Sequence, residues 1–127
     1  MKNLIRSLAS IAFLLSAASA FALEIVPYTP ETLAAAQKAG KPVALQFHAD
    51  WCPSCRSQTK TFESMKDDAS LPVTLFVADY DNVRELRMAL RVGSQSTIIF
   101  YHGKKQTARS VFETDPDRLR TALKSTL

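Results

Sequence analysis

Residues 51–55 read Trp-Cys-Pro-Ser-Cys, and this stretch follows an apolar run, Val43-Ala44-Leu45-Gln46-Phe47, and precedes a segment with helical character. The chain of 127 residues holds two cysteines, Cys52 and Cys55, and both lie in this stretch. Two thiols at this spacing can close a small disulfide ring across one helical turn. If a helix begins at the motif, its unpaired N–H groups and positive dipole end favour a thiolate at Cys52. The stretch therefore predicts thiol–disulfide exchange.

The first 22 residues are typical of a secretory signal peptide. Lys2 and Arg6 precede an apolar stretch and small residues, and the pattern predicts cleavage after Ala20 or Ala22. The apolar stretch is too short for a membrane span, which needs about 20 residues, although an uncleaved anchor is the alternative interpretation. An exported chain meets an oxidising compartment. The short, alanine-rich form is typical of bacteria, which predicts a periplasmic protein.

Residues 23–127 are expected to form one domain, since about 100 residues can bury a modest core. Removing Lys2 and Arg6 with the signal lowers the formal net charge from +4 to +2, because the signal holds no acidic residue. This mild charge and the lack of a basic run predict that the protein has no nucleic-acid partner. We expect a monomer without stable membrane insertion.

Helical and β-prone segments alternate along this domain. Proline after a capping side chain marks two helix starts, at Thr29-Pro30 and Asp115-Pro116. The predicted elements are helices at 29–39, 53–65, about 83–90 and 115–127, and strands at 43–47, 73–78, 96–101 and 106–112. This order predicts an α/β fold with a central mixed sheet of about four strands, covered by helices on both faces.

An apolar strand followed by Asp-Trp-Cys-x-x-Cys and then by β-α-β-β-α resembles the thioredoxin superfamily over residues 28–127. The finer pattern, His48-Ala49-Asp50-Trp51-Cys52 with Ser94-Gln95-Ser96-Thr97 later, is similar to small secreted thioredoxin-like proteins. It also resembles the reductase-side domains of bacterial disulfide-bond electron-transfer systems. The resemblance implies a thioredoxin-like fold. A structural zinc site is disfavoured, because such sites usually need four ligands.

The resemblance also implies roles for the residues of the motif. Cys52 would be the exposed nucleophile, and Cys55 the more buried resolving thiol. Trp51 would offer an apolar contact surface beside the site. Pro53 and Ser54 would set the helix start and tune the Cys52 thiolate.

Four further residues are candidates for substrate binding or tuning. Gln95, Ser96 and Thr97 would line the substrate groove, with plain loop and strand packing as the alternative. His48 could be a titrating neighbour of the thiolate, or a half-packed histidine at a strand end.

Three departures from the family pattern concern the same region. Gln46 stands where thioredoxins have a buried acid, and a neutral amide cannot act as the base for Cys55. Ser96-Thr97 best fits the family's cis-proline and threonine, and because a cis bond before a non-proline residue costs about 3 kcal/mol, we expect a trans peptide there. Strand 73–78 lacks a lysine that thioredoxins often have.

Three functions follow as hypotheses. The first is a thiol–disulfide oxidoreductase, reducing rather than oxidising, that needs no cofactor beyond the Cys52–Cys55 pair. It would exchange electrons with protein thiols or disulfides and with an upstream redox partner. The alternative is a periplasmic Cu(I) carrier using both cysteines and His48, since soft thiolates favour Cu(I). The third is a static structural disulfide, although so short a loop stabilises a fold little.

Overall fold

Five strands form one mixed sheet in the computed structural model, which describes residues 22–127. The predicted signal peptide, residues 1–22, lies outside the described residues except for Ala22. Across the sheet the order is β1 (Glu24–Pro27), β3 (Thr74–Asp79), β2 (Pro42–His48), β4 (Thr97–His102) and β5 (Lys105–Val111). β3 lies parallel to both β1 and β2, whereas β4 lies antiparallel to β2 and to β5. The predicted mixed α/β sheet is confirmed.

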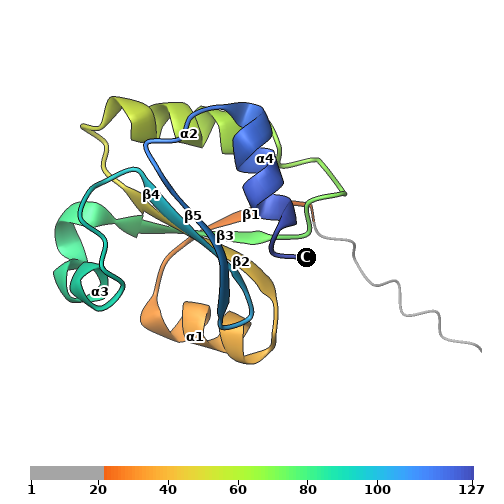
Figure 1. Ribbon diagram of the computed structural model, residues 1–127, viewed down its shortest axis with the longest axis horizontal. Helices are drawn as coiled ribbons and strands as arrows, with labels where there is room; N and C mark the ends of the chain where they lie inside the picture. Colours follow the sequence, from red (N-terminus) through yellow and green to blue (C-terminus); the bar gives the residue numbers. More distant parts are fainter. Residues whose placement is uncertain (1–21) are drawn as a thin grey trace, which may run out of the picture.

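Helices cover both faces of this sheet, as predicted (Figure 1). α2 (Pro53–Glu63) and α4 (Pro116–Lys124) lie on one face, and α1 (Pro30–Lys38) and α3 (Arg84–Ala89) lie on the other. None of these helices, in the part of the chain that the structure describes, has the length and apolar character that a membrane crossing needs.

Three of the helices begin in the same way, with a capping side chain followed by proline. Thr29, Cys52 and Asp115 each accept a hydrogen bond from the backbone N–H three residues later. Proline fits the first helical position because the N–H that it lacks would have no partner there. The sequence pattern predicted the caps at Thr29 and Asp115. The third capping residue, Cys52, was predicted to lie at a helix start but not to cap it.

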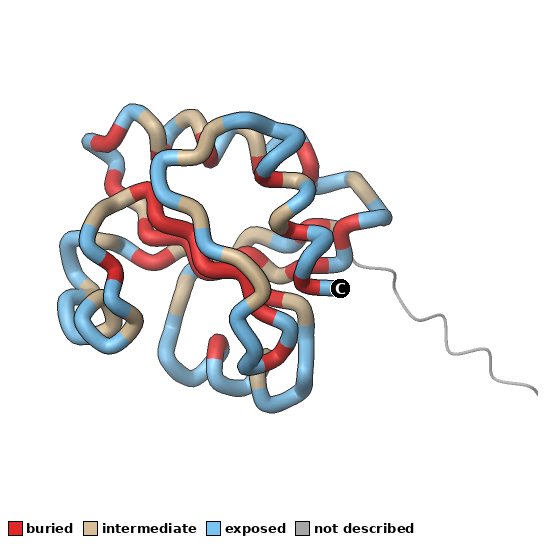
Figure 2. The backbone as a smooth tube through the Cα atoms, in the orientation of Figure 1, coloured by how far each residue is buried: buried red, intermediate tan, exposed pale blue. Residues whose placement is uncertain are grey.

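Two apolar layers, one on each face, hold the helices to the sheet. β2 contributes to both because its side chains alternate: Ala44 packs on the face of α2 and α4, and Leu45 on that of α1 and α3. Phe62 and Leu123 anchor α2 and α4 to the first layer. Buried residues accordingly concentrate along the central strands, while most residues of the helices are exposed or half-buried (Figure 2).

The sequence interpretation missed β1, so the sheet has five strands rather than about four. β1 is four residues long, ends in proline and lies at the edge of the sheet, where its residues are half-buried or exposed. It therefore lacks the alternation or the continuous apolar run that marks a strand. It forms because Glu24–Pro27 pairs in parallel with Thr74–Val77.

The start of the third helix also differs from the prediction. Asp81 and Asn82 stand just before the predicted helix at about 83–90, and their side chains are of the kind that caps a helix. In the structure they belong instead to a 3-10 turn, η1 (Tyr80–Asn82). The Asp79 side chain caps that turn by accepting a hydrogen bond from the Asp81 N–H at 3.1 Å. α3 then begins at Arg84 without a side-chain cap.

Candidate active site

The two cysteines lie where β2 ends and α2 begins. Cys52 has an extended backbone (φ −92°, ψ 116°) and occupies the N-cap position, and Pro53 is the first helical residue. The Cys52 sulfur accepts a hydrogen bond from the Cys55 backbone N–H at 3.2 Å. In this place the sulfur satisfies a free donor of the helix and lies at its positive end. The predicted setting of Cys52 at a helix start is confirmed.

Ser96 approaches the cysteines from the loop before β4. Its backbone is left-handed (φ 61°), which is uncommon for a residue other than glycine. Three hydrogen bonds fix this conformation. The Ser96 N–H donates to the Phe47 carbonyl at 2.9 Å, and its own carbonyl accepts from the Phe112 N–H and from Gln58 Nε2 at 3.1 and 3.2 Å. No peptide bond is cis within residues 22–127, so the bond before Ser96 is trans, as expected.

Two hydroxyl groups contact the sulfurs directly. Ser96 Oγ lies 3.3 Å from the Cys52 sulfur and 3.1 Å from the Cys55 sulfur. Ser54 Oγ lies 3.3 Å from the Cys52 sulfur and 2.6 Å from Ser96 Oγ. The four side chains therefore form one continuous polar cluster, in which Ser96 touches both members of the redox pair.

The surroundings shift the pKa values of the two thiols in opposite directions. Burial opposes ionisation of Cys52, but hydrogen bonds from Cys55, Ser54 and Ser96 outweigh burial and lower its pKa from 9.0 to about 7. Burial raises the pKa of Cys55, and its contact with Cys52 raises it further. Near neutral pH a large share of Cys52 is thus thiolate, whereas Cys55 remains a thiol. This assignment matches the roles of nucleophile and resolving thiol.

The expectation that Cys52 is exposed is wrong. Both cysteines have an exposed fraction of 0%, and with Ala49 they form a small buried cluster against which Tyr80 packs. The Ser96 and Ser54 hydroxyls also cover the Cys52 sulfur. A substrate disulfide reaches this sulfur only if one of the covering side chains moves aside.

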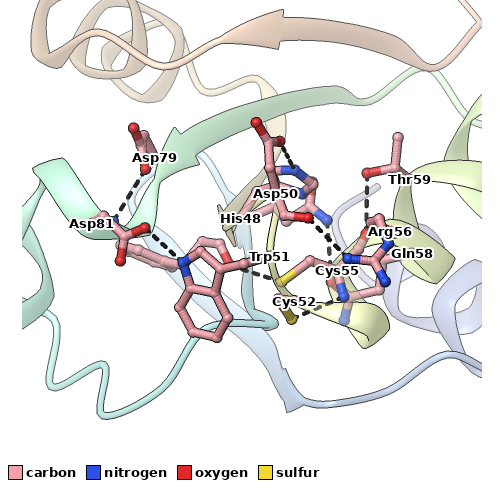
Figure 3. A network of polar contacts seen from close by, with 12 residues as sticks. His48, Asp50, Trp51, Cys52, Cys55, Arg56, Gln58, Thr59, Asp79 and Asp81 are labelled. Carbon is pink, nitrogen blue, oxygen red and sulfur yellow. Dashed lines mark hydrogen bonds and ion pairs between the residues drawn. The ribbon is translucent and has the colours of Figure 1, made fainter.

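Trp51 is exposed, as the prediction of an apolar contact surface requires. Its exposed fraction is 57%, and its indole N–H donates to Asp81 Oδ2 at 2.8 Å (Figure 3). Asp81 is held in turn through its own N–H, which donates to Asp79 Oδ1. Sequence reasoning missed the role of Asp81, because thirty positions separate it from Trp51 and no pattern marks the pairing.

His48 pairs with an acid and not with a sulfur. Its Nε2 lies 2.9 Å from Asp50 Oδ1, and the Asp50 carbonyl accepts a hydrogen bond from Arg56 Nη1 (Figure 3). His48, Asp50 and Trp51 border a hollow of about 400 Å³, to which β3 and the turn after it contribute Asp79 and Asp81. One flank of the motif is therefore acidic.

The two remaining candidates in the loop before β4, Gln95 and Thr97, differ in burial. Gln95 is half-buried beside the site and can still meet a substrate. Thr97 has an exposed fraction of 2%, and its hydroxyl donates to the Ser94 carbonyl at 2.8 Å. The buried Thr97 therefore stabilises the loop through this hydrogen bond, and the expectation that it lines the groove is wrong.

Gln46 takes part in a buried amide pair. Its Nε2 donates to Gln58 Oε1 at 3.1 Å, and Gln58 Nε2 donates to the carbonyls of Ser96 and Glu113. Gln58 thus ties α2 to the Ser96 loop and to the segment after β5. It was missed in the sequence, although a glutamine one turn after Cys55 on the inner face of a helix is a usable signal.

No three His, Cys, Asp or Glu side chains gather to hold a metal ion anywhere in the described range. His48, the third candidate ligand of the Cu(I) hypothesis, is paired with Asp50.

Comparisons with known proteins agree with this geometry. The model of the thioredoxin family matches residues 25–125. Thioredoxin-2 of Saccharomyces cerevisiae is 29% identical over 67% of this chain and 80% of its own length, and a Chlamydia trachomatis thioredoxin is 33% identical over 61% and 74%. A crystal structure of Trxlp from Edwardsiella tarda superposes with a TM-score of 0.74 at 30% identity, covering 79% of this chain and 98% of that one.

Proposed function

Because the chain belongs to the thioredoxin family and is a thiol–disulfide oxidoreductase, we propose that it reduces protein disulfides outside the cytoplasm. The Cys52 thiolate attacks one sulfur of the substrate disulfide, forms a mixed disulfide and expels the first substrate thiolate. Cys55 then attacks Cys52, which closes the Cys52–Cys55 disulfide and releases the second substrate thiol. The substrate gains two electrons, and the cysteine pair loses two. A separate redox partner must return them, in keeping with the resemblance to electron-transfer reductases.

The observation that carries the reducing direction is the moderate acidity of Cys52. Its pKa of about 7 is close to that of thioredoxin, whereas the strong oxidant DsbA has a nucleophile with a pKa near 3.5. The stabilising contacts are the Cys55 thiol, two hydroxyls and one backbone N–H, all of them neutral, and Arg56 binds the Asp50 carbonyl. Less stabilisation of the thiolate means less stabilisation of the reduced form, and the reduced protein therefore gives up its electrons more readily.

The test of the activity is insulin-disulfide reduction by dithiothreitol. We expect the wild type to accelerate it and Cys52→Ser to abolish the acceleration. Cys55→Ser should instead trap the mixed disulfide, which mass spectrometry detects. Absence of any rate above background would contradict the proposal. Equilibration with glutathione tests the direction: we expect a potential near that of thioredoxin, about −270 mV, and a value near −120 mV would assign an oxidant.

The compartment rests on residues 1–22, whose basic start, apolar stretch and Ala-x-Ala sites suit an exported protein. We expect expression of the full chain in a Gram-negative bacterium to give a periplasmic monomer that begins after Ala20 or Ala22. Fractionation and intact-mass measurement check this. A cytoplasmic protein with an unprocessed N-terminus would contradict it.

A further inference from the structure

We propose that Ser96 and Ser54 form a hydroxyl relay that carries the Cys55 proton to solvent when Cys55 resolves the mixed disulfide. This inference rests on the proposed exchange reaction and adds two catalytic residues to it. Such a relay would replace a buried acid, because position 46 is a glutamine and its amide is already bonded to Gln58.

The relay follows the distances in the polar cluster. Ser96 Oγ lies 3.1 Å from the Cys55 sulfur and 2.6 Å from Ser54 Oγ. Ser54 is half-buried whereas Ser96 is fully buried, so Ser54 is the serine nearer to solvent. The Cys52 sulfur also accepts from the Cys55 thiol, but it is the atom under attack. The remaining acceptor in the described part of the chain is the Phe47 carbonyl at 3.9 Å, and a carbonyl cannot pass a proton on. Ser96 is therefore the exit for this proton.

The proton balance is simple. As the Cys55 sulfur attacks Cys52, its proton moves to Ser96 Oγ, Ser96 passes its own proton to Ser54 Oγ, and Ser54 passes one to water. The Cys52–Cys55 bond forms, and the bond between Cys52 and the substrate breaks, with its electron pair leaving on the substrate thiolate. Both serines end as neutral hydroxyls, and no further oxidant or reductant is needed.

The same hydroxyls can serve both half-reactions. In the reduced protein they donate to the Cys52 thiolate. Once Cys52 is bonded to a substrate it no longer carries that charge, so the Ser96 hydroxyl can turn to Ser54. The backbone of Ser96 does not have to move, because hydrogen bonds to Phe47, Phe112 and Gln58 hold its left-handed conformation. A strained conformation held by several contacts is typical of a functional position.

The test uses a nitrobenzoate disulfide, which releases one coloured thiolate at each step. The first release reports attack by Cys52, and the second reports resolution by Cys55. Ser96→Gly removes the hydroxyl, and its φ of 61° suits glycine, so the fold should be kept. We expect this variant to slow the second release about tenfold or more at pH 7. Thr59→Val is the matched control: it removes a hydroxyl that donates to the Cys55 carbonyl at 3.1 Å but contacts no sulfur.

Four outcomes decide the question. No first release in the wild type would refute the proposed exchange itself. A normal first release with an unchanged second release in Ser96→Gly would refute the relay alone. The slowing of the second release in Ser96→Gly should shrink as the pH rises through the pKa of Cys55, since Cys55 has then already lost its proton. Slowing that persists at high pH would mean that the substitution displaced the sulfurs, and it would overturn the relay. Adding Ser54→Ala to Ser96→Gly should slow the second release no further, because the two hydroxyls act in series, and multiplied effects would contradict this.

Discussion

At the scale of the residue, Cys52 is acidified by neutral donors. Three side-chain contacts and one backbone N–H act on a sulfur that burial would otherwise keep protonated. Such contacts are short-ranged, so the Cys55 thiol and the two serine hydroxyls together set the acidity of Cys52. Its acidity should therefore respond to substitution of Ser54 or Ser96 and hardly to salt, which screens distant charges.

The rate of Cys52 alkylation by iodoacetamide should rise with pH and level off, with a midpoint near pH 7, because only the thiolate reacts. Ser96→Gly removes a donor to the thiolate, so the midpoint should move to higher pH. Mass spectrometry assigns the modified cysteine. A midpoint that stays in place in the variant would contradict the role of this hydroxyl.

Trp51, the single tryptophan of the chain, should lose its fixed orientation in Asp81→Ala. We expect lower fluorescence anisotropy and a KM for insulin raised a few-fold, while the Cys52 alkylation rate stays the same. The loss of stability should be about 1 kcal/mol or less, because the hydrogen bond is exposed. Asp81→Asn keeps an acceptor oxygen and serves as the control. Equal anisotropy in all three proteins would disprove the anchoring.

At the scale of the element, local sequence patterns predicted most strands and helices but missed the contacts between residues far apart in the chain. The buried strand and the helix that starts at Cys52 were readable, because an apolar run and a proline-marked cap are local signals. β1 was missed because it depends on pairing with β3. The resemblance placed the loop with Ser96 at the substrate groove, but the burial of Cys52 and the contacts of the Ser96 hydroxyl with both sulfurs were missed, since Cys52 and Ser96 lie 44 positions apart. Only the fold brings them together.

The Gln46–Gln58 pair should be worth more to stability than a surface hydrogen bond. Gln58→Leu leaves the buried Gln46 amide and the Glu113 carbonyl without this partner. We expect a loss of about 1 to 3 kcal/mol in the free energy of unfolding. Adding Gln46→Leu should recover part of it, because the unpaired amide is then gone. Urea unfolding of the single and double variants measures the coupling, and additive losses would argue against the pair.

At the scale of the whole molecule, the fold brings three separate segments to one end of the sheet. β2 ends at the motif, α2 begins there, and the loop before β4 arrives beside them because β4 is antiparallel to β2. The site is thus assembled only in the folded chain. The acidity of Cys52 is consequently a property of the fold, and it must be linked to stability.

The sign of this linkage follows from the two pKa shifts. Cys52 has a pKa of about 7 in the folded protein against an ordinary value of 9.0, so its contribution is full above pH 9 and is lost as the pH falls through 7. The raised pKa of Cys55 acts oppositely: its contribution holds below pH 9 and is lost at higher pH. The reduced protein should therefore gain stability between pH 7 and pH 9.

The gain should be at most about 2 kcal/mol, since one pKa unit corresponds to about 1.4 kcal/mol and solvent near the site reduces the effect. Urea unfolding of the reduced protein at pH 6 and pH 9, compared with reduced Cys52→Ser, measures the contribution of this thiol together with its coupling to Cys55. The oxidised wild type is a second control: its disulfide carries no titrating thiol in either the folded or the unfolded state. If reduced wild type and Cys52→Ser show the same pH dependence, the fold does not stabilise the thiolate, and the attack on substrate must draw on another source of reactivity.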